Sequence, residues 1–434
     1  MLRALLVGVV AVASWLIASW SCHSISERVY WTIPPVALAW FLTRCTPGHL
    51  RRLRPLLALL AAFLVLSVAV ASIFLGPKAV LSWRFWLEAA TCLYFITAAI
   101  LILVGLRRVL LKGTHYLHER WQFSPGVRMI VCEVAPLVLL LTFALPYAMA
   151  FSNVHRFKMP NFRNPKDAWG RPFEEVEFRA ADGTTIRGWW IPAKGLTSSA
   201  SATGRAEKCP RTLVFCHGIA GNRSVFLPFV EAADWLDANI LMFDLRGHGD
   251  SDGRTVTLGY WEKEDVLAAI AFVRREKPDE AREVIGMGVS LGAATLAEAA
   301  ALVEPPLDGV ILDSAFTSTQ DMTHAVVKNF PPACHPWLLT LGLPMAEWHA
   351  GCPMMDVRPE SSVARLRAPV LLLHSRGDPL IPSEHAHRLL AQAAEPKRLC
   401  IFELPGHCDA FFAQRERYRD EVVAFGARVG SRER

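Results

Sequence analysis

Ser290 lies between Gly288 and Gly292 in a Gly-x-Ser-x-Gly pattern, which is the clearest sign of chemistry in the chain. Residues Val284 to Gly288 are typical of a buried strand, and a helical pattern starts at Leu291. A serine at the apex of a sharp strand-to-helix turn needs small neighbours, because its backbone is strained. Such a turn directs the hydroxyl out of the sheet, above the free N–H groups of the helix. The pattern therefore predicts a nucleophilic serine.

An acid and a histidine follow Ser290 in the chain order that such a site requires. Asp378 follows a predicted strand, Pro369 to Leu373, and His407 follows another, Leu399 to Phe402. Serine alone is a poor nucleophile, so His407 would accept its proton. Asp378 would fix the tautomer of the imidazole and stabilise its charged form. These spacings predict a Ser-His-Asp triad.

A third element of the site is an oxyanion hole made of backbone N–H groups. The predicted strand Thr212 to Cys216 runs into His217 and Gly218, from which a backbone N–H can reach the nucleophile. We expect Ile219 and Leu291 to be the two donors. Each would contribute about 3 kcal/mol of transition-state stabilisation if its N–H group points at the oxyanion.

Each of these residues has an alternative interpretation. Ser290 could be an ordinary serine at a helix start. Asp313, which ends the predicted strand Val310 to Leu312, could be the acid in place of Asp378, because acids recur at strand ends in such sheets. Four other polar residues near the strand ends are expected to orient loops, to brace a turn or to pack. They are His217, His248, His374 and Asp244.

The elements that must position these residues alternate between strands and helices from Pro172 onward. An initial hairpin is predicted around Asp182-Gly183. The expected strands are Glu175 to Arg179, Thr185 to Ile191, Thr212 to Cys216, Ile240 to Phe243, Val284 to Gly288, Val310 to Leu312, Pro369 to Leu373 and Leu399 to Phe402. The expected helices are Val225 to Leu236, Tyr260 to Glu276, Leu291 to Val303, Ser383 to Ala394 and Asp409 to Val429. This alternation predicts an α/β domain with a doubly wound, mostly parallel sheet.

Two stretches of this domain are expected to leave the sheet. The small-residue stretch Ala193 to Ala206 is typical of a surface loop. Residues 314–366 are expected to form a cap over the site. Large apolar residues are frequent in this cap, among them Phe316, Phe330, Trp337, Leu338, Leu341, Met345, Trp348 and Met354. They would either form a small core of the cap or line an acyl-chain pocket or a membrane-facing entrance.

The first third of the chain contains long apolar runs free of charge. They extend over Ala4 to Ser26, Val29 to Thr43, Pro55 to Gly76, Ala89 to Leu106 and Val134 to Val154. A transmembrane helix needs about 20 apolar residues, and only the second run is short and interrupted, by Pro34-Pro35. The first run could be a signal peptide, but the runs behind it favour a retained anchor. We therefore predict a transmembrane helical region over residues 1–154 with four or five spans, and a linker over residues 155–171.

Basic residues predict how these spans are oriented, because short cytoplasmic loops hold an excess of Lys and Arg. The loops between runs two and three and between runs four and five hold most of them. These residues are Arg44, Arg51, Arg52, Arg54, Arg107, Arg108, Lys112, Arg120 and Arg128. The last span then carries the chain out of the cytoplasm. Basic residues after Val154 weigh less, because they lead into a large domain. An integral membrane protein with an extracytoplasmic catalytic domain is expected.

Composition limits the remaining classes of function. The 434 residues carry a net charge of +6, which is too small to favour nucleic-acid binding. A hydrophobic content of 52% with only 20% charged residues excludes intrinsic disorder. No metal motif, P-loop or dinucleotide fingerprint occurs in the sequence, so neither a metal nor a cofactor is expected. Cys334 and Cys352 could pair if the domain lies outside the cytoplasm.

Several short motifs together make residues 172–430 resemble the α/β-hydrolase superfamily, and within it the serine aminopeptidase-like and lysophospholipase-like hydrolases. The motifs are Asp182-Gly183, His217-Gly218 with Asn222-Arg223, the stretch Asp244 to Ser251 (DLRGHGDS), the Ser290 turn, Gly377-Asp378 and Gly406-His407. The resemblance does not extend to the membrane region. It implies an α/β-hydrolase fold and catalytic roles for Ser290, Asp378 and His407, as the spacing does.

The combined expectation is a membrane-anchored serine hydrolase that cleaves carboxylic esters, possible substrates being small-molecule or lipid esters. The same triad would also suit a peptidase or a thioesterase, since the residues do not distinguish the leaving group. An alternative from another class is a non-catalytic binding module tethered to the membrane.

Overall fold

The computed structural model describes residues 158–194, 210–219, 221–328 and 335–430, together with scattered residues between 124 and 155. Residues Pro146–Arg434 form one compact unit. No helix among these described residues has the length and apolar character that a membrane crossing needs. The first four predicted spans, most of the fifth, and residues 195–206 of the predicted surface loop lie outside the described residues.

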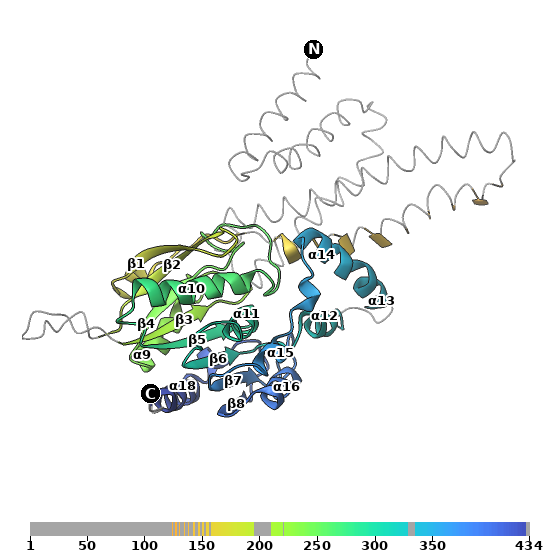
Figure 1. Cartoon of the computed structure of the whole chain (residues 1–434). Coiled ribbons are helices and arrows are strands. Elements are labelled where there is room, and N and C mark those ends of the chain that lie inside the picture. The colour runs from red at the N-terminus through yellow and green to blue at the C-terminus, as the bar shows by residue number, and fades with distance from the viewer. Residues whose placement is uncertain are drawn as a thin grey trace, which may run out of the picture. The chain divides into compact units, whose positions relative to one another are not determined.

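Eight strands form one sheet in the order β1-β2-β4-β3-β5-β6-β7-β8 (Figure 1). Their bounds are β1 Glu174–Arg179, β2 Thr185–Ile191, β3 Arg211–Cys216, β4 Asn239–Phe243, β5 Glu283–Val289, β6 Gly309–Asp313, β7 Val370–Ser375 and β8 Lys397–Phe402. The first hairpin pairs antiparallel, as does β2 with β4, and the remaining pairs are parallel. The mostly parallel sheet predicted from the alternation of patterns is confirmed.

Helices cover both faces of this sheet, as a doubly wound fold requires. One face packs against α10 Glu262–Glu276, α11 Leu291–Ala300, α15 Pro359–Val363 and α16 Glu384–Gln392. The other packs against η2 Leu227–Phe229, α9 Val230–Trp235, α17 Ala410–Ala413 and α18 Arg415–Gly430. The sheet therefore lies between two hydrophobic cores.

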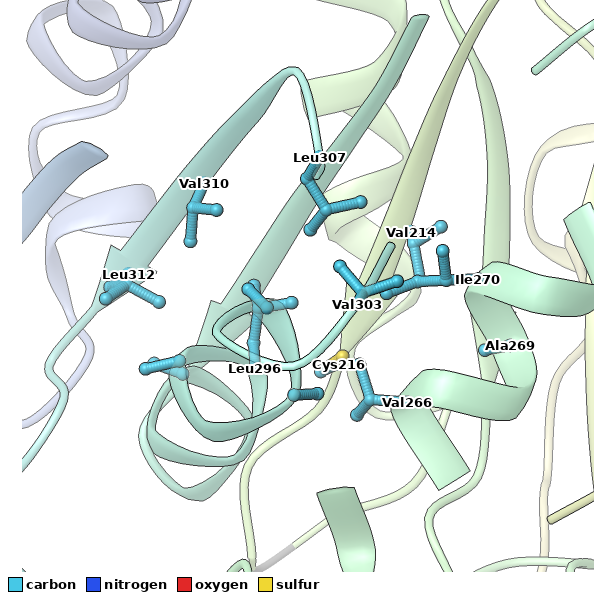
Figure 2. Packing of buried hydrophobic residues seen from close by; sticks show 14 of the residues in the cluster. Val214, Cys216, Val266, Ala269, Ile270, Leu296, Val303, Leu307, Val310 and Leu312 are labelled. Atoms are coloured by element: carbon cyan, nitrogen blue, oxygen red, sulfur yellow. The ribbon is translucent and has the colours of Figure 1, made fainter. Parts of the chain in front are cut away.

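Strand β3 shows how the sequence produces these two cores. Val214 and Cys216 belong to the core under α10 and α11, whereas Leu213 and Phe215 belong to the opposite core. Side chains alternate between the faces of a strand, so a strand covered on both faces is a continuous apolar run. Figure 2 shows Val214 and Cys216 packed with residues of α10, α11 and β6. Burying each large apolar side chain contributes about 1.5–3 kcal/mol.

The insertion predicted as a cap lies between β6 and β7. It contains α12 Thr319–Val327, α13 His335–Trp337, η4 Leu338–Gly342, α14 Leu343–Ala350 and η5 Met354–Asp356. Figure 1 shows α12, α13 and α14 grouped at one side of the sheet. Ala346, Ala350 and Met354 pack with Ala150 and Val154 in a separate hydrophobic cluster. The cap residues therefore share this cluster with residues at the end of the last predicted span.

Some local predictions differ from the structure. The helix predicted from Asp409 to Val429 is broken at Gln414, where φ is −127° and ψ is 51°. The break separates α17 from α18, and it lets Phe411 and Tyr418 pack against each other at 5.4 Å between ring centroids. Cys352 is a buried free thiol, so its suggested pairing with Cys334 is not formed; Cys334 lies outside the described residues. The predicted linker 155–171 contains a short helix, α8 Pro165–Trp169.

Candidate active site

Ser290 occupies a strained turn between β5 and α11. Its φ of 55° and ψ of −117° lie in a region that non-glycine residues rarely adopt. The turn is held by the N–H of Ser290, which donates to the carbonyl of Asp313 at 2.8 Å. A Cβ at Gly288 would lie 2.4 Å from the carbonyl oxygen of Gly292, and one at Gly292 would lie 2.2 Å from that of Cys216. Both flanking glycines are therefore required by close backbone packing.

The three residues predicted as a triad form one hydrogen-bonded chain. His407 Nδ1 lies 2.6 Å from Asp378 Oδ2, and His407 Nε2 lies 2.8 Å from Ser290 Oγ. A carboxylate only accepts hydrogen bonds, so Nδ1 carries the proton and Nε2 accepts the Ser290 hydroxyl. The Asp378 side chain is fully buried, whereas the His407 side chain is 18% exposed. The arrangement can transfer a proton from the serine to the histidine.

Backbone contacts hold the acid and the histidine in place. The second carboxylate oxygen of Asp378 accepts the N–H groups of Leu380 and Ile381, each at 2.9 Å. The loops after β7 and β8 are joined by a hydrogen bond from the Gly377 N–H to the Leu404 carbonyl at 2.9 Å. Asp378 and His407 are thus fixed by two neighbouring strands of the sheet.

Asp313, the alternative acid, has other partners. Its carboxylate accepts the hydroxyl of Tyr418 and that of Ser314, each at 2.9 Å. Burial raises the pKa of Asp313 and also raises the pKa of Tyr418. Because Asp378 is the carboxylate bonded to His407, the structure favours Asp378 over Asp313 as the partner of the histidine.

The two predicted oxyanion donors lie beside the serine. Leu291 is the first residue of α11, so its N–H has no acceptor within the helix. A Cβ at Gly218 would lie 3.5 Å from the Ser290 Cβ, which shows that the loop after β3 passes next to the nucleophile. Ile219 follows Gly218 directly. The N–H groups of Ile219 and Leu291 thus come from two segments that meet at Ser290.

Two buried histidines brace the loop that carries Ile219. His217 Nε2 accepts the Leu245 N–H at 3.0 Å, so its Nδ1 carries the proton and donates to the Gly218 carbonyl at 2.8 Å. That carbonyl belongs to the same peptide unit as the Ile219 N–H. Burial, reinforced by His248, lowers the pKa of His217 to about 3, which keeps the ring neutral. His248 Nε2 lies 3.0 Å from the Ile219 carbonyl oxygen. Both histidines hold loops, as the sequence indicated.

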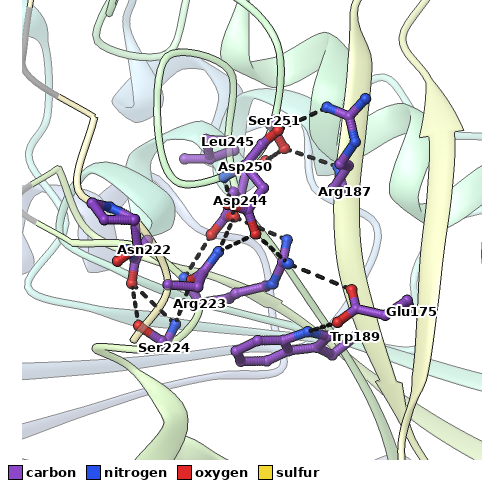
Figure 3. A network of polar contacts seen from close by, with 12 residues as sticks. Glu175, Arg187, Trp189, Asn222, Arg223, Ser224, Asp244, Leu245, Asp250 and Ser251 are labelled. Carbon is purple, nitrogen blue, oxygen red and sulfur yellow. Dashed lines mark hydrogen bonds and ion pairs between the residues drawn. The ribbon is translucent and has the colours of Figure 1, made fainter. Parts of the chain in front are cut away.

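The loops after β3 and β4 also hold an ionic network, in which Arg223 and Asp244 are buried and Asp250 is exposed (Figure 3). The Oδ1 atom of Asp244 accepts the backbone N–H of Arg223 at 2.7 Å, and its Oδ2 atom accepts the guanidinium at 2.9 Å. The same guanidinium donates to Asp250 at 2.7 Å and lies 4.5 Å from the ring centroid of Trp189. Paired buried charges of this kind are costly to break. Asp244 therefore braces the loops after β3 and β4, as predicted from its turn position.

Sequence reasoning missed one set of residues in this region. Lys158 and Asn161 lie in the stretch predicted as a linker, yet Lys158 bonds to the loop after β4 and Asn161 bonds to the loops after β3 and β4. The motif Asn222-Arg223 indicated the loop after β3. No pattern in the sequence indicated that Lys158 and Asn161 would contact the loops. Within the part of the chain that the structure describes, no cluster of three or more His, Cys, Asp or Glu side chains could hold a metal ion.

Comparison with known proteins supports the fold described above. The family model for the alpha/beta hydrolase fold matches residues 211–341. The uncharacterized protein YfhR of Escherichia coli K12 is 31% identical over 262 residues, which are 60% of this chain and 81% of YfhR. The alpha/beta hydrolase domain-containing protein WAV2 of Arabidopsis thaliana is 24% identical over 254 residues, covering 57% of this chain and 76% of WAV2.

A solved structure shares the fold. The esterase Pf2001 of Pyrococcus furiosus aligns with a TM-score of 0.51 and 20% identity, covering 64% of this chain and 98% of the esterase. The chain belongs to the α/β-hydrolase family. The family match and the shared fold support a hydrolase.

Proposed function

We propose that this protein is a membrane-anchored serine hydrolase that cleaves carboxylic esters through an acyl-enzyme on Ser290. The observation that carries the proposal is the continuous chain of hydrogen bonds from Asp378 through His407 to Ser290. A serine becomes a useful nucleophile only when a positioned base accepts its proton. Here the base has a buried carboxylate on one side and the hydroxyl on the other.

The geometry supports a two-stage reaction. Ser290 Oγ attacks the ester carbonyl carbon while His407 Nε2 takes the hydroxyl proton, and the N–H groups of Ile219 and Leu291 stabilise the oxyanion. The intermediate collapses when the carbon–oxygen bond to the alcohol breaks, and His407 donates its proton to the leaving alcohol. A water molecule then attacks the acyl-enzyme with His407 as the base. The bond between the acyl carbon and Ser290 Oγ then breaks, His407 returns its proton to Oγ, and the carboxylic acid leaves.

Membrane anchoring rests on the apolar runs of the first 154 residues. Basic residues in the loops between them support an extracytoplasmic catalytic domain. The cap supports a lipid ester as substrate, because α14 packs against Ala150 and Val154 at the end of the last predicted span. Trp348 on the same helix is 73% exposed, and tryptophan is enriched at membrane interfaces. A cap beside the bilayer would meet esters with long acyl chains.

Turnover of matched substrates tests the proposal. We expect the detergent-solubilised full chain to hydrolyse p-nitrophenyl acyl esters, with kcat/KM rising from acetate to longer chains and with slower cleavage of the corresponding anilides. Ser290→Ala is the matched control and should show none of this turnover. Equal rates for short and long chains would contradict a lipid ester, and faster anilide cleavage would favour a peptidase.

Reporter fusions test the predicted topology separately. A reporter that is active only outside the cytoplasm, fused after Val154, should be active. Activity of a cytosol-only reporter at the same position would contradict the proposed orientation.

A further inference from the structure

The segment between the last predicted span and β1 is bonded to the loops around the candidate site. Asn222 donates its side-chain amide to the carbonyls of Met159 at 2.7 Å and Pro160 at 3.1 Å. The Lys158 ammonium group donates to the Ser251 carbonyl. Residues 158–160 are therefore held by the loop after β3 on one side and by the loop after β4 on the other.

Asn161 makes the most specific contacts of this segment. Its side-chain amide donates to Asp244 Oδ2 at 2.9 Å and to Asp250 Oδ2 at 2.7 Å, and its side-chain oxygen accepts the Ser224 N–H at 3.2 Å. Only an amide offers two donors and an acceptor in so short a side chain. Hydrogen bonds to carboxylates are also stronger than those between neutral groups. Asn161 therefore ties both carboxylates of the Arg223 network to Ser224.

These contacts reach the loop that carries the proposed oxyanion donor. Asn222 follows Ile219 by three residues and is fully buried. Its side-chain oxygen accepts the Ser224 N–H at 3.1 Å, the Ser224 hydroxyl at 2.8 Å and the Val225 N–H at 3.1 Å. One end of the Asn222 amide thus fixes the turn of its own loop, and the other end fixes the carbonyls of residues 159 and 160.

We propose that residues 158–161 position the oxyanion loop, with Asn161 as the principal positioning residue. The inference rests on the proposed function, because it assumes that the Ile219 N–H stabilises the oxyanion. A donor must lie about 2.7–3.1 Å from that oxygen, and a displacement of about 1 Å can reduce the rate by about 100-fold. The chain that leaves the last predicted span is therefore part of the support of the catalytic site.

The inference is tested in the detergent-solubilised full chain with Asn161→Ala. We expect kcat for a p-nitrophenyl ester to fall by about tenfold while KM stays within about twofold, because the loop orients the transition state more than the substrate. Phenylboronic acid, which adds to the serine hydroxyl as a tetrahedral anion, should bind more weakly by the same factor. A merely structural defect would lower the folded fraction without changing this inhibition constant.

Asn164→Ala is the matched control, because it makes the same substitution three residues further along. The Asn164 side chain accepts the Asp167 N–H at the start of α8. This variant should keep kcat, KM and the inhibition constant within about twofold of the wild type. Lys158→Met provides a second test that keeps the aliphatic stem but removes the donor to Ser251, and kcat should fall in the same direction by a smaller factor.

Two results would overturn the inference in different ways. If Asn161→Ala and Lys158→Met both keep the kcat and the inhibition constant of an active wild type, residues 158–161 do not position the loop. Absence of turnover in the wild type would overturn the proposed function itself, and with it this inference.

Discussion

His407 and His217 both lie in loops that follow the carboxyl ends of strands, but their surroundings differ. His407 lies between a carboxylate and a hydroxyl and is 18% exposed. His217 is fully buried between a backbone N–H and a backbone carbonyl, and burial keeps it neutral. A backbone N–H or carbonyl does not act as an acid or a base toward an imidazole, whereas a serine hydroxyl can transfer its proton to an adjacent base. The partners of each histidine therefore decide whether it transfers protons or holds a loop.

The same difference extends to the loops that carry the two histidines. Asp378, beside His407, has one oxygen bonded to a titratable ring. Asp244, in the loop after β4, is bonded to Arg223, Asn161 and backbone N–H groups. A guanidinium stays protonated at all relevant pH values. The loops after β7 and β8 thus carry the groups that can transfer protons. The loops after β3 and β4 carry groups that hold the backbone in place.

The largest loss of kcat is expected from Ser290→Ala, which removes the group that donates its proton to His407. Removal of the nucleophile should lower kcat by a factor on the order of 10⁵, since triad members act as a unit. The thermal unfolding temperature should remain close to that of the wild type, because the substitution removes one hydroxyl group and adds no atoms that could clash. Retention of a tenth of the wild-type kcat would contradict the nucleophilic role. Steady-state kinetics and a melting curve measure both quantities.

The next effect comes from the two candidate acids. Asp378→Asn should lower kcat by about 10⁴-fold, because an amide donates to Nδ1 and leaves Nε2 protonated, unable to accept the serine proton. Asp313→Asn should leave kcat within about tenfold of the wild type, because Asp313 is bonded to Tyr418 and Ser314. The comparison of kcat at constant folded fraction checks this. A more severe loss in Asp313→Asn would transfer the role of the acid to Asp313.

The smallest effect concerns His217, which braces the loop after β3 and makes the free energy of unfolding depend on pH. The native pKa of His217 is about 3, against an ordinary value of 6.5. Between these values the unfolded chain binds a proton that the native state does not bind, so stability falls as the pH falls. The contribution of His217 to the free energy of unfolding is fully present above pH 6.5. Below this pH it decreases by at most about 1.4 kcal/mol per pH unit.

His217→Asn removes this contribution. The slope of unfolding free energy against pH between about 7.5 and 5 should be smaller in His217→Asn than in the wild type. The remaining slope would include His385, whose pKa is also lowered by burial. Equal slopes in denaturation experiments would show that the native pKa of His217 is not lowered and would weaken the contrast with His407.

Much of the fold follows from local patterns in the sequence. Strand β5 was expected at Val284 to Gly288 and extends over Glu283–Val289, because a strand covered on both faces is a continuous apolar run. The glycines beside Ser290 indicated the turn, and their close backbone contacts explain why that signal is reliable. Asn161 carried no such signal, since its partner Asp244 lies 83 residues away in the sequence. No local pattern indicated the break at Gln414, which separates α17 from α18.

Covalent labelling tests the central claim most directly. The detergent-solubilised full chain would be treated with a fluorophosphonate, and the modified peptide would be mapped by mass spectrometry. The account predicts a single adduct on Ser290 that is absent in Ser290→Ala and formed much more slowly in Asp378→Asn. A folded wild-type protein that takes up no label, or that carries the adduct on another serine, would contradict the proposed nucleophile.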